Sequence, residues 1–136
     1  MSDRAAYPES QIVAVIKKAD TVEKVEVAAG SSTQTQVLIG EKDNAPNFAM
    51  RRFIMGPDGG MPRHTNTVEH EQYVLKGQAR VGIGEAVHEV SAGDVLLIPA
   101  LAPHYYEVVE APFEFLCIVP NLPDKITILD ESSELR

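Results

Sequence analysis

The fold is decided by residues 59–77, which read Gly59-Gly60-Met61-Pro62-Arg63-His64-Thr65-Asn66-Thr67-Val68-Glu69-His70-Glu71-Gln72-Tyr73-Val74-Leu75-Lys76-Gly77. This stretch holds two of the four histidines and ends in an apolar strand followed by a Lys-Gly turn. Residues 93–104 contain the same kinds of feature, namely a glycine, an apolar strand, a proline and then His104. Two histidine-bearing strand ends in one small β-rich chain predict a metal ion held inside a barrel.

Short β-prone segments separated by Gly and Pro turns account for most of the remaining chain. Strands are expected at 33–39, 48–55, 70–75, 78–83, 86–90, 95–98, 103–109, 113–119 and 125–129. We expect Lys76-Gly77 to close a hairpin, Gly56–Gly60 to form a turn and Ala111-Pro112 to end a strand. Ile12–Ile16 is apolar and β-branched, so it could form a strand or a short helix. Without a helical period between residues 33 and 119, the pattern predicts an all-β antiparallel sandwich or barrel.

Composition limits the class of protein. A chain of 136 residues is one domain, and a net charge of -8 without a basic cluster argues against a nucleic-acid partner. The apolar runs are too short to span a bilayer, and the first ten residues lack an apolar signal core. The single cysteine, Cys117, fits a reducing compartment. We therefore expect a cytoplasmic protein with no membrane partner.

The two histidine stretches carry a resemblance to a known family. The chain resembles the cupins, whose first motif is G-x5-H-x-H-x3-E-x6-G. His64 takes the first histidine position, Asn66 stands where the second belongs, and His70 takes the glutamate position, with six residues between it and Gly77. The leading glycine is displaced, because four residues separate Gly59 from His64 instead of five.

The second cupin motif, G-x5-P-x-G-x2-H-x3-N, is also present. Gly93, Pro99 and His104 match it, while Leu101 and Val108 replace its second glycine and its asparagine. Further similarity to a subgroup of small single-domain cupins, in which histidine replaces the motif glutamate, lies in residues 37–40, 45–48 and 69–71. The resemblance implies one double-stranded β-helix, or jelly-roll, domain over 1–136. It has a signature barrel at 33–120, an N-terminal strand segment at 10–30 and a C-terminal strand at 125–129.

By resemblance, His64, His70 and His104 bind one divalent transition metal per chain. Neutral imidazole suits Mn, Fe, Cu, Ni and Zn, with Mn or Fe favoured, and three ligands leave positions open. We expect His104 to face the other two from the opposing sheet. Asn66 either coordinates weakly, hydrogen-bonds a metal-bound water, or marks a weakened site. The competing interpretation is that these are ordinary surface or turn histidines, as we expect for His88.

Strand alternation and the resemblance together predict a pocket beside the metal. The resemblance directs six side chains towards it or its rim: Arg51, Phe53, Met61, Tyr106, Phe115 and Cys117. Arg51, as its sole cation, could hold a carboxylate or phenolate, and Tyr106 could hydrogen-bond substrate or oxygen, so these two are the catalytic candidates. Cys117 is either a soft ligand or a small buried hydrophobe. The apolar members could equally be plain core.

The resemblance implies an oxidoreductase of the dioxygenase type, in which dioxygen and a small organic substrate fill the open positions. A non-redox isomerase or lyase is one alternative, and a metal- or ligand-binding protein without turnover is another. The sequence names no substrate. We also expect a homodimer formed through the apolar N-terminal segment, because small cupins often pair in this way and twofold dimers are the commonest homo-oligomers.

Overall fold

A computed structural model describes residues 12–129 of the chain. It contains eight strands, β1 (Val25–Glu26), β2 (Ser31–Ile39), β3 (Phe48–Asn66), β4 (His70–Ile83), β5 (Ala86–Ser91), β6 (Val95–Ile98), β7 (His104–Pro120) and β8 (Ile126–Ile128). Two single 3-10 turns, Ala19–Thr21 and Glu41–Asp43, lie before β1 and after β2. The described residues contain no α-helix, and no helix long and apolar enough to cross a membrane.

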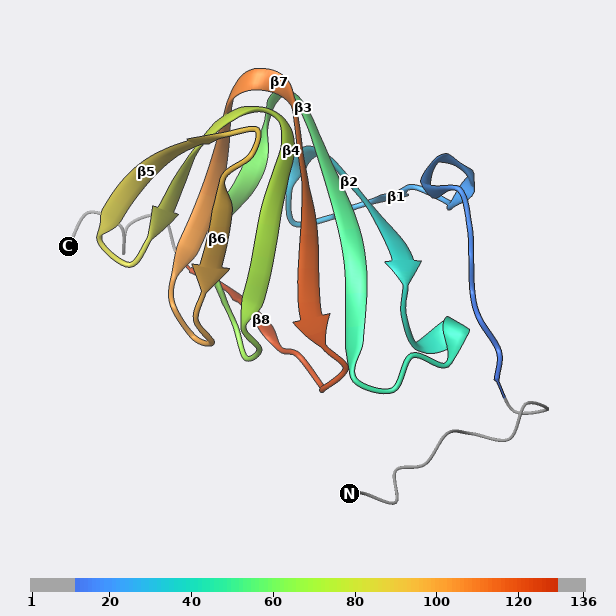
Figure 1. Cartoon of the computed structure of the whole chain (residues 1–136). Coiled ribbons are helices and arrows are strands. Elements are labelled where there is room, and N and C mark those ends of the chain that lie inside the picture. The colour runs from blue at the N-terminus through green and yellow to red at the C-terminus, as the bar shows by residue number, and fades with distance from the viewer. Residues whose placement is uncertain (1–11, 130–136) are drawn as a thin grey trace.

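The strands pair antiparallel in the order β1-β2-β3-β7-β4-β5, with β6 added to β4 and β8 added to β3. Strand β7 lies between β3 and β4 over most of its length, and these three long strands curl around a common interior (Figure 1). The all-β jelly-roll architecture expected from the sequence is therefore confirmed.

Three strands are longer than the turn signals predicted. The expected hairpin at Lys76-Gly77 is wrong, because both residues lie inside β4, which pairs with β6 before this point and with β5 after it. Gly77 has a φ of 82°, and a Cβ there would collide with the carbonyl oxygen of Pro112. Ala111-Pro112 likewise lies inside β7, and Gly56–Gly60 inside β3 at a shift of register. These residues mark bends in continuous strands.

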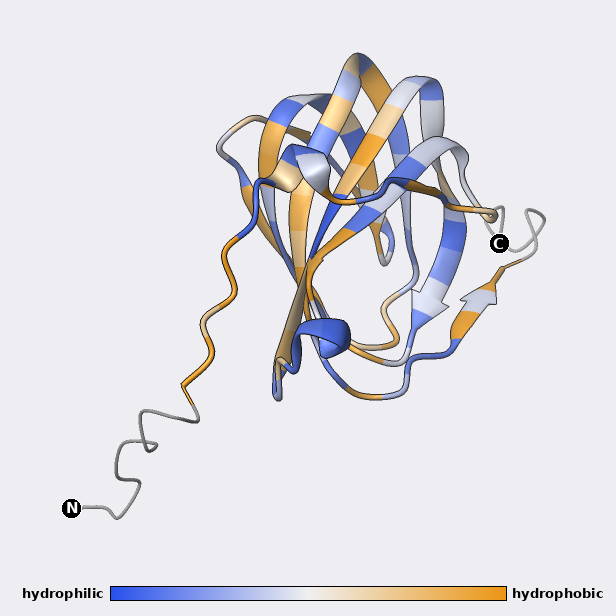
Figure 2. Cartoon of the chain, turned by 90° about the vertical axis from the view of Figure 1, so that its right-hand side faces the viewer, coloured by the Kyte–Doolittle hydropathy of each residue, from blue (hydrophilic) through white to orange (hydrophobic). Residues whose placement is uncertain are grey.

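The N-terminal segment differs from the rest of the chain. Residues 12–18 form neither the strand nor the short helix considered for Ile12–Ile16, and the strand within this segment is the two-residue β1. Val13 is 80% exposed and Ile16 93% exposed, and this apolar stretch runs away from the barrel in Figure 2. Within the described part of the chain these residues pair with no strand.

Side chains from β3, β4 and β7 fill the interior. The most deeply buried apolar residues are Met55, Val74, Ala79, Val81, Ile98, Phe113, Phe115 and Cys117. Towards one end this core gives way to buried polar side chains, namely His64, Asn66, His70, Gln72 and His104. Buried polar groups need hydrogen-bond partners or a ligand, so this end is where a site is to be sought.

Candidate metal centre

Three strand ends bring His64, His70 and His104 together. His70 and His104 are the first residues of β4 and β7, and His64 lies near the end of β3. The ring centroids of His64 and His104 are 4.1 Å apart, and those of His70 and His104 are 5.8 Å apart. His64 and His104 are direct partners on adjacent strands, so the expectation that His104 faces His64 from an opposing sheet is wrong.

Backbone carbonyls orient two of the rings. The Nδ1 atom of His64 lies 2.7 Å from the Pro62 carbonyl oxygen, and that of His104 lies 2.9 Å from the Ala102 carbonyl oxygen. A carbonyl only accepts, so Nδ1 carries the proton and donates it, and the lone pair is on Nε2. Within residues 12–129, the buried Nε2 atoms of His70 and His104 have no hydrogen-bond partner. Such nitrogens are suited to bind an ion.

The electrostatic environment keeps the histidines neutral. Burial lowers the pKa of His70 to about 3, with repulsion from Arg51 adding to the effect. Burial likewise lowers the pKa of His104 to about 4 and moves the pKa of His64 below its usual value. Near pH 7 all three are uncharged, which is the form that a metal requires.

The three imidazoles are chemically suited to a transition metal, although their nitrogen atoms are not arranged around a common point. No group of three or more His, Cys, Asp or Glu side chains within residues 12–129 is already arranged to hold a metal ion. His64, His70 and His104 are nevertheless gathered at short range and buried. Neutral, unpaired imidazole nitrogens are the donors that Mn, Fe, Cu, Ni and Zn accept.

Only one end of the Asn66 side-chain amide has a hydrogen-bond partner in the described chain. Its Nδ2 donates to Oδ2 of Asp124 over 2.9 Å, and its Oδ1 is buried without a partner in the described chain. Asp124 is itself fixed, because its Oδ1 accepts from the backbone nitrogen of Thr67 over 2.9 Å. The amide oxygen is thus the free atom, which is compatible with weak coordination or with a bond to a water. Sequence reasoning missed Asp124, which lies 58 residues away and outside both motifs.

The histidines and Asn66 line a small interior cavity with a volume of about 140 Å³, which we call the inner cavity. Five of the expected pocket residues lie on its wall: Arg51, Phe53, Met61, Tyr106 and Phe115. Cys117 is placed behind His70 instead, with its Sγ 3.3 Å from Nδ1 of that ring. Five further wall residues were not expected: Val27, Thr35, Met55, Gln72 and Ile126. Strand alternation after His70 could have revealed Gln72.

Aromatic rings form one side of the inner cavity. Phe115 stacks between Phe53 and Tyr106, with centroids 5.1 Å and 5.2 Å away. The hydroxyl oxygen of Tyr106 accepts a hydrogen bond from Nε2 of Gln72 over 2.7 Å, so its own proton is free to be donated. Burial raises the pKa of Tyr106, which keeps the hydroxyl protonated. Tyr106 is therefore a neutral donor beside the histidines.

Arg51 brings the only cationic side chain to this wall among the described residues. Its Nη2 donates to Sγ of Cys117 over 3.4 Å, and its guanidinium carbon lies 5.1 Å from the Phe53 ring centroid. Its Nε is buried without a partner, and none of the ion pairs within residues 12–129 involves it. A charged donor is thus left available inside the cavity.

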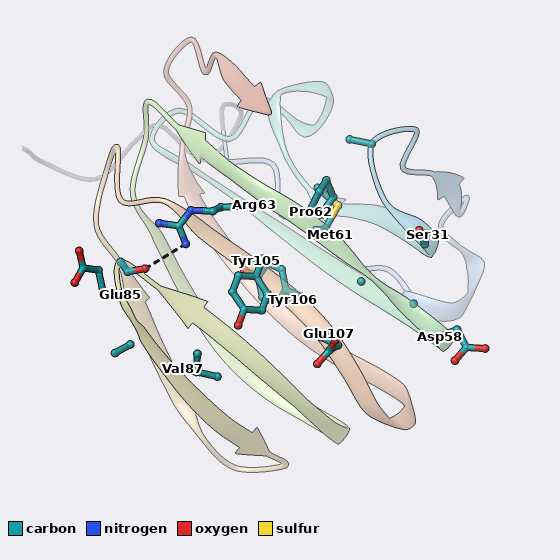
Figure 3. Close-up of a pocket in the computed structure, with 15 residues that line it drawn as sticks. Ser31, Asp58, Met61, Pro62, Arg63, Glu85, Val87, Tyr105, Tyr106 and Glu107 are labelled. Atoms are coloured by element: carbon teal, nitrogen blue, oxygen red, sulfur yellow. Dashed lines mark hydrogen bonds between the residues drawn. The ribbon is translucent and has the colours of Figure 1, made fainter. Parts of the chain in front are cut away.

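Figure 3 shows a larger hollow of about 880 Å³, which we call the outer groove. It runs between residues 58–63, the turn from β4 to β5 and residues 105–107, and it shares Met61 and Tyr106 with the inner cavity. Its charged side chains are Asp58, Arg63, Glu85 and Glu107. Among the described residues no histidine lines it, so the three histidines expected to bind metal belong to the smaller space.

Comparison with known families and structures agrees with this fold. A family model described as "Cupin domain" matches residues 51–119. The polyketide cyclase RemF from Streptomyces resistomycificus is 26% identical over 90% of this chain and 91% of its own, with a TM-score of 0.78.

Two further solved structures are similar. The cupin-2 domain protein Rru_A2000 from Rhodospirillum rubrum is 25% identical over 87% of this chain and 82% of its own, with a TM-score of 0.73. A cupin 2 domain-containing protein from Halorhodospira halophila is 28% identical over 74% of this chain and 72% of its own, with a TM-score of 0.69. Comparison with curated proteins gives no match.

Proposed function

Because the chain belongs to the cupin family, as its two motifs predicted, we propose that it is a metal-dependent enzyme acting on a small organic substrate. His64, His70 and His104 would hold one divalent ion per chain, drawn from Mn, Fe, Cu, Ni and Zn, with Mn or Fe favoured. The observation that carries the proposal is the pair of buried, unpartnered Nε2 atoms on His70 and His104. Burial without a partner is costly, and an ion relieves it.

The bound ion would supply Lewis acidity and, for Fe, Mn or Cu, redox chemistry. The protein's own residues would do the rest. The backbone carbonyls of Pro62 and Ala102 fix the histidine tautomers. The stacked rings of Phe53 and Phe115 keep water from the apolar side of the cavity, and Tyr106 donates a proton in a hydrogen bond to substrate.

The first reaction class that we propose is oxidation by dioxygen, as in a dioxygenase. Three protein ligands leave room for other molecules, and the inner cavity of about 140 Å³ adjoins the histidines. Asn66 supports this reading, because a neutral amide oxygen gives up its place more readily than a fourth imidazole.

A second candidate is a non-redox reaction of the isomerase or lyase kind. The observation that favours it is the likeness to a polyketide cyclase, at 26% identity over 90% of this chain. In that case the ion would polarise a carbonyl oxygen of the substrate. A protein that binds its ligand without turnover has the same donor set, so the ion and the reaction must be determined together.

Elemental analysis of protein purified without a metal-binding tag tests the proposal. We expect one transition-metal ion per chain, with occupancy lost in His104→Ala and kept in His88→Ala, whose histidine is exposed on β5. Nitric oxide added to Fe(II)-loaded protein then separates the reaction classes. A spectral change supports oxygen chemistry, and its absence leaves the non-redox class. Equal metal content in both variants would overturn the site.

We also propose a homodimer, supported by the exposed apolar stretch Ile12–Ile16 beside a sheet whose β1 is only two residues long. Strand β2 pairs with β1 through Gln34 and Thr35, which leaves its residues 36–39 without a second strand in the described chain. An unpaired sheet edge and an exposed apolar segment in the same chain favour exchange between two copies. Sedimentation equilibrium should give twice the mass of the 14.8 kDa chain. A monomer at micromolar concentration, or a dimer unaffected by Val13→Asp, would contradict this.

A further inference from the structure

We propose that Arg51 binds the carboxylate of the substrate, and that the substrate is a small monocarboxylate with an apolar body. This inference rests on the proposed function, because it names the ligand of the same cavity. The Arg51 guanidinium is a cation and has few contacts among the described residues.

The contacts of Arg51 leave part of its guanidinium free, because Nη2 carries two hydrogens and gives one of them to Cys117. Nη2 is engaged with the Cys117 sulfur over 3.4 Å, and one face lies over the Phe53 ring. Nε is buried and has no acceptor within residues 12–129. The next residue, Arg52, has a carboxylate partner by contrast. Its Nε and Nη2 both donate to Oε1 of Glu114. Arg51 lacks the carboxylate that Arg52 has.

The surroundings select an anion of single charge. The planar fork of arginine matches a carboxylate through two parallel hydrogen bonds. The wall of the inner cavity, as far as the chain is described, contains no Asp or Glu, and its histidines are neutral. The nearby carboxylate of Asp124 lies outside this wall and is engaged by Asn66 and Thr67, so no carboxylate on the wall faces a bound anion. One arginine balances one negative charge, which favours a monocarboxylate over a dianionic phosphate group. The outer groove, with three carboxylates, would repel the same ligand.

The remaining wall determines the body of the ligand. Phe53, Phe115 and Tyr106 form a continuous stack, and Met61 adds a further apolar surface. A volume of about 140 Å³ is small. A liquid water takes about 30 Å³, so the space equals only a few waters. A short unsaturated or aromatic acid fits this combination of one charge and a flat apolar wall.

Calorimetric titration with benzoate, and with benzamide as its neutral counterpart, tests the inference. Zn(II)-loaded and metal-free protein are both titrated, so that direct binding of the carboxylate to the ion is separated from binding to Arg51. We expect benzoate to bind more tightly than benzamide in both forms. Arg51→Met should weaken benzoate by about tenfold or more, because a charge-assisted hydrogen bond is lost, while benzamide changes little. Arg51→Lys should fall between, since it keeps the charge without the fork.

Arg63→Met is the matched control, because it removes the cation of the outer groove and should leave benzoate binding unchanged. Zinc affinity, measured by competition with a chelator, should also be unchanged in Arg51→Met. The inference is overturned if benzoate binds no better than benzamide, or if Arg51→Met binds it as wild type does. Failure of the wild type to bind zinc would instead overturn the metal site, and the metal-free titration would still decide the role of Arg51. If Arg51→Met does not fold, the wild-type comparison of benzoate with benzamide and the Arg51→Lys variant decide.

Discussion

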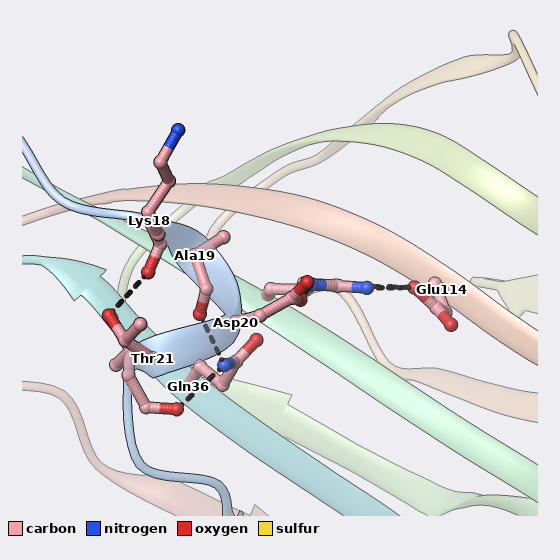
Figure 4. A network of polar contacts seen from close by, with 8 residues as sticks. Lys18, Ala19, Asp20, Thr21, Gln36 and Glu114 are labelled. Carbon is pink, nitrogen blue, oxygen red and sulfur yellow. Dashed lines mark hydrogen bonds and ion pairs between the residues drawn. The ribbon is translucent and has the colours of Figure 1, made fainter.

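Two adjacent arginines, on opposite faces of strand β3, have different partners. On the outer face, Arg52 donates to Glu114 over 2.6 Å and reaches Asp20 at 3.4 Å, within the network of Figure 4. On the inner face, Arg51 has a sulfur and an aromatic ring but no carboxylate in the described chain. The charge of Arg52 is paired with carboxylates of the protein, whereas the charge of Arg51 is available to a bound ligand.

The same contrast extends to the other polar groups of the two faces. Outside, Arg80 pairs with Glu89 and Glu107. Inside, Nε2 of His70, Nε2 of His104 and Oδ1 of Asn66 are buried without partners in the described residues. Each such group costs about 1–3 kcal/mol of stability when unsatisfied. Among the described residues, five of the six residues with a buried, unpartnered polar side-chain atom line the inner cavity, and Gln36 is the exception.

The largest expected effect is loss of metal binding. We expect His104→Ala to weaken binding by about a hundredfold or more, since even loss of a residue that only orients a ligand costs about 10- to 100-fold. His88→Ala, which removes an exposed imidazole, should bind metal as wild type does. Chelator competition measures both. Equal affinities would remove the distinction between the inner histidines and the outer one.

The second effect is a dependence of the stability of the metal-free protein on pH. The pKa values of His70 and His104 are lowered to about 3 and about 4 in the folded state, so below the usual value near 6.5 the unfolded chain binds more protons. Stability should therefore fall as the pH drops from 7 to 5, by up to about 4 kcal/mol for the two rings together.

Urea unfolding in the presence of a chelator measures this slope. His104→Gln keeps a polar side chain but removes one buried titrating ring, so its slope should be shallower than that of wild type. A stability that is constant from pH 7 to 5 would mean that the rings are protonated as readily in the fold as outside it.

The third effect separates the two arginines directly. Arg52→Met should lower the free energy of unfolding by about 1–3 kcal/mol, because it leaves a partly buried Glu114 without its partner. Arg51→Met should leave stability unchanged or raise it, because it removes a charge that has no partner. Thermal and urea unfolding compare the two variants. A larger loss in Arg51→Met would show that the inner arginine is structural.

The smallest effect concerns Asn66. Asn66→His should tighten metal binding, because imidazole suits these ions better than an amide oxygen. If Asn66 keeps a position open for substrate, turnover should fall as affinity rises, and if the site is merely weakened, both should rise. Asn66→Ala is the control, because it frees Asp124 without adding a donor. Unchanged affinity in Asn66→His would mean that residue 66 does not face the ion.

The sequence predicted the strands and the histidine positions because both depend on local spacing. The turn signals at Gly77 and Pro112 misled, since the residues that end short strands also bend long ones, and only the pairing of β4 with β7 on both sides of Gly77 distinguishes the cases. The relation of His64 to His104 depends on the register of β3 against β7. Asp124 contacts Asn66 from a distant loop, and no local pattern encodes such a contact.

Anomalous diffraction from crystals of the protein loaded with Mn(II) or Zn(II) decides whether the inner histidines bind the ion, because it locates the ion without reference to activity. We expect one peak per chain, within coordinating distance of the Nε2 atoms of His64, His70 and His104. The Oδ1 atom of Asn66 should be the nearest further protein oxygen. A peak in the outer groove near Asp58, Glu85 or Glu107, or no ordered peak at all, would contradict it.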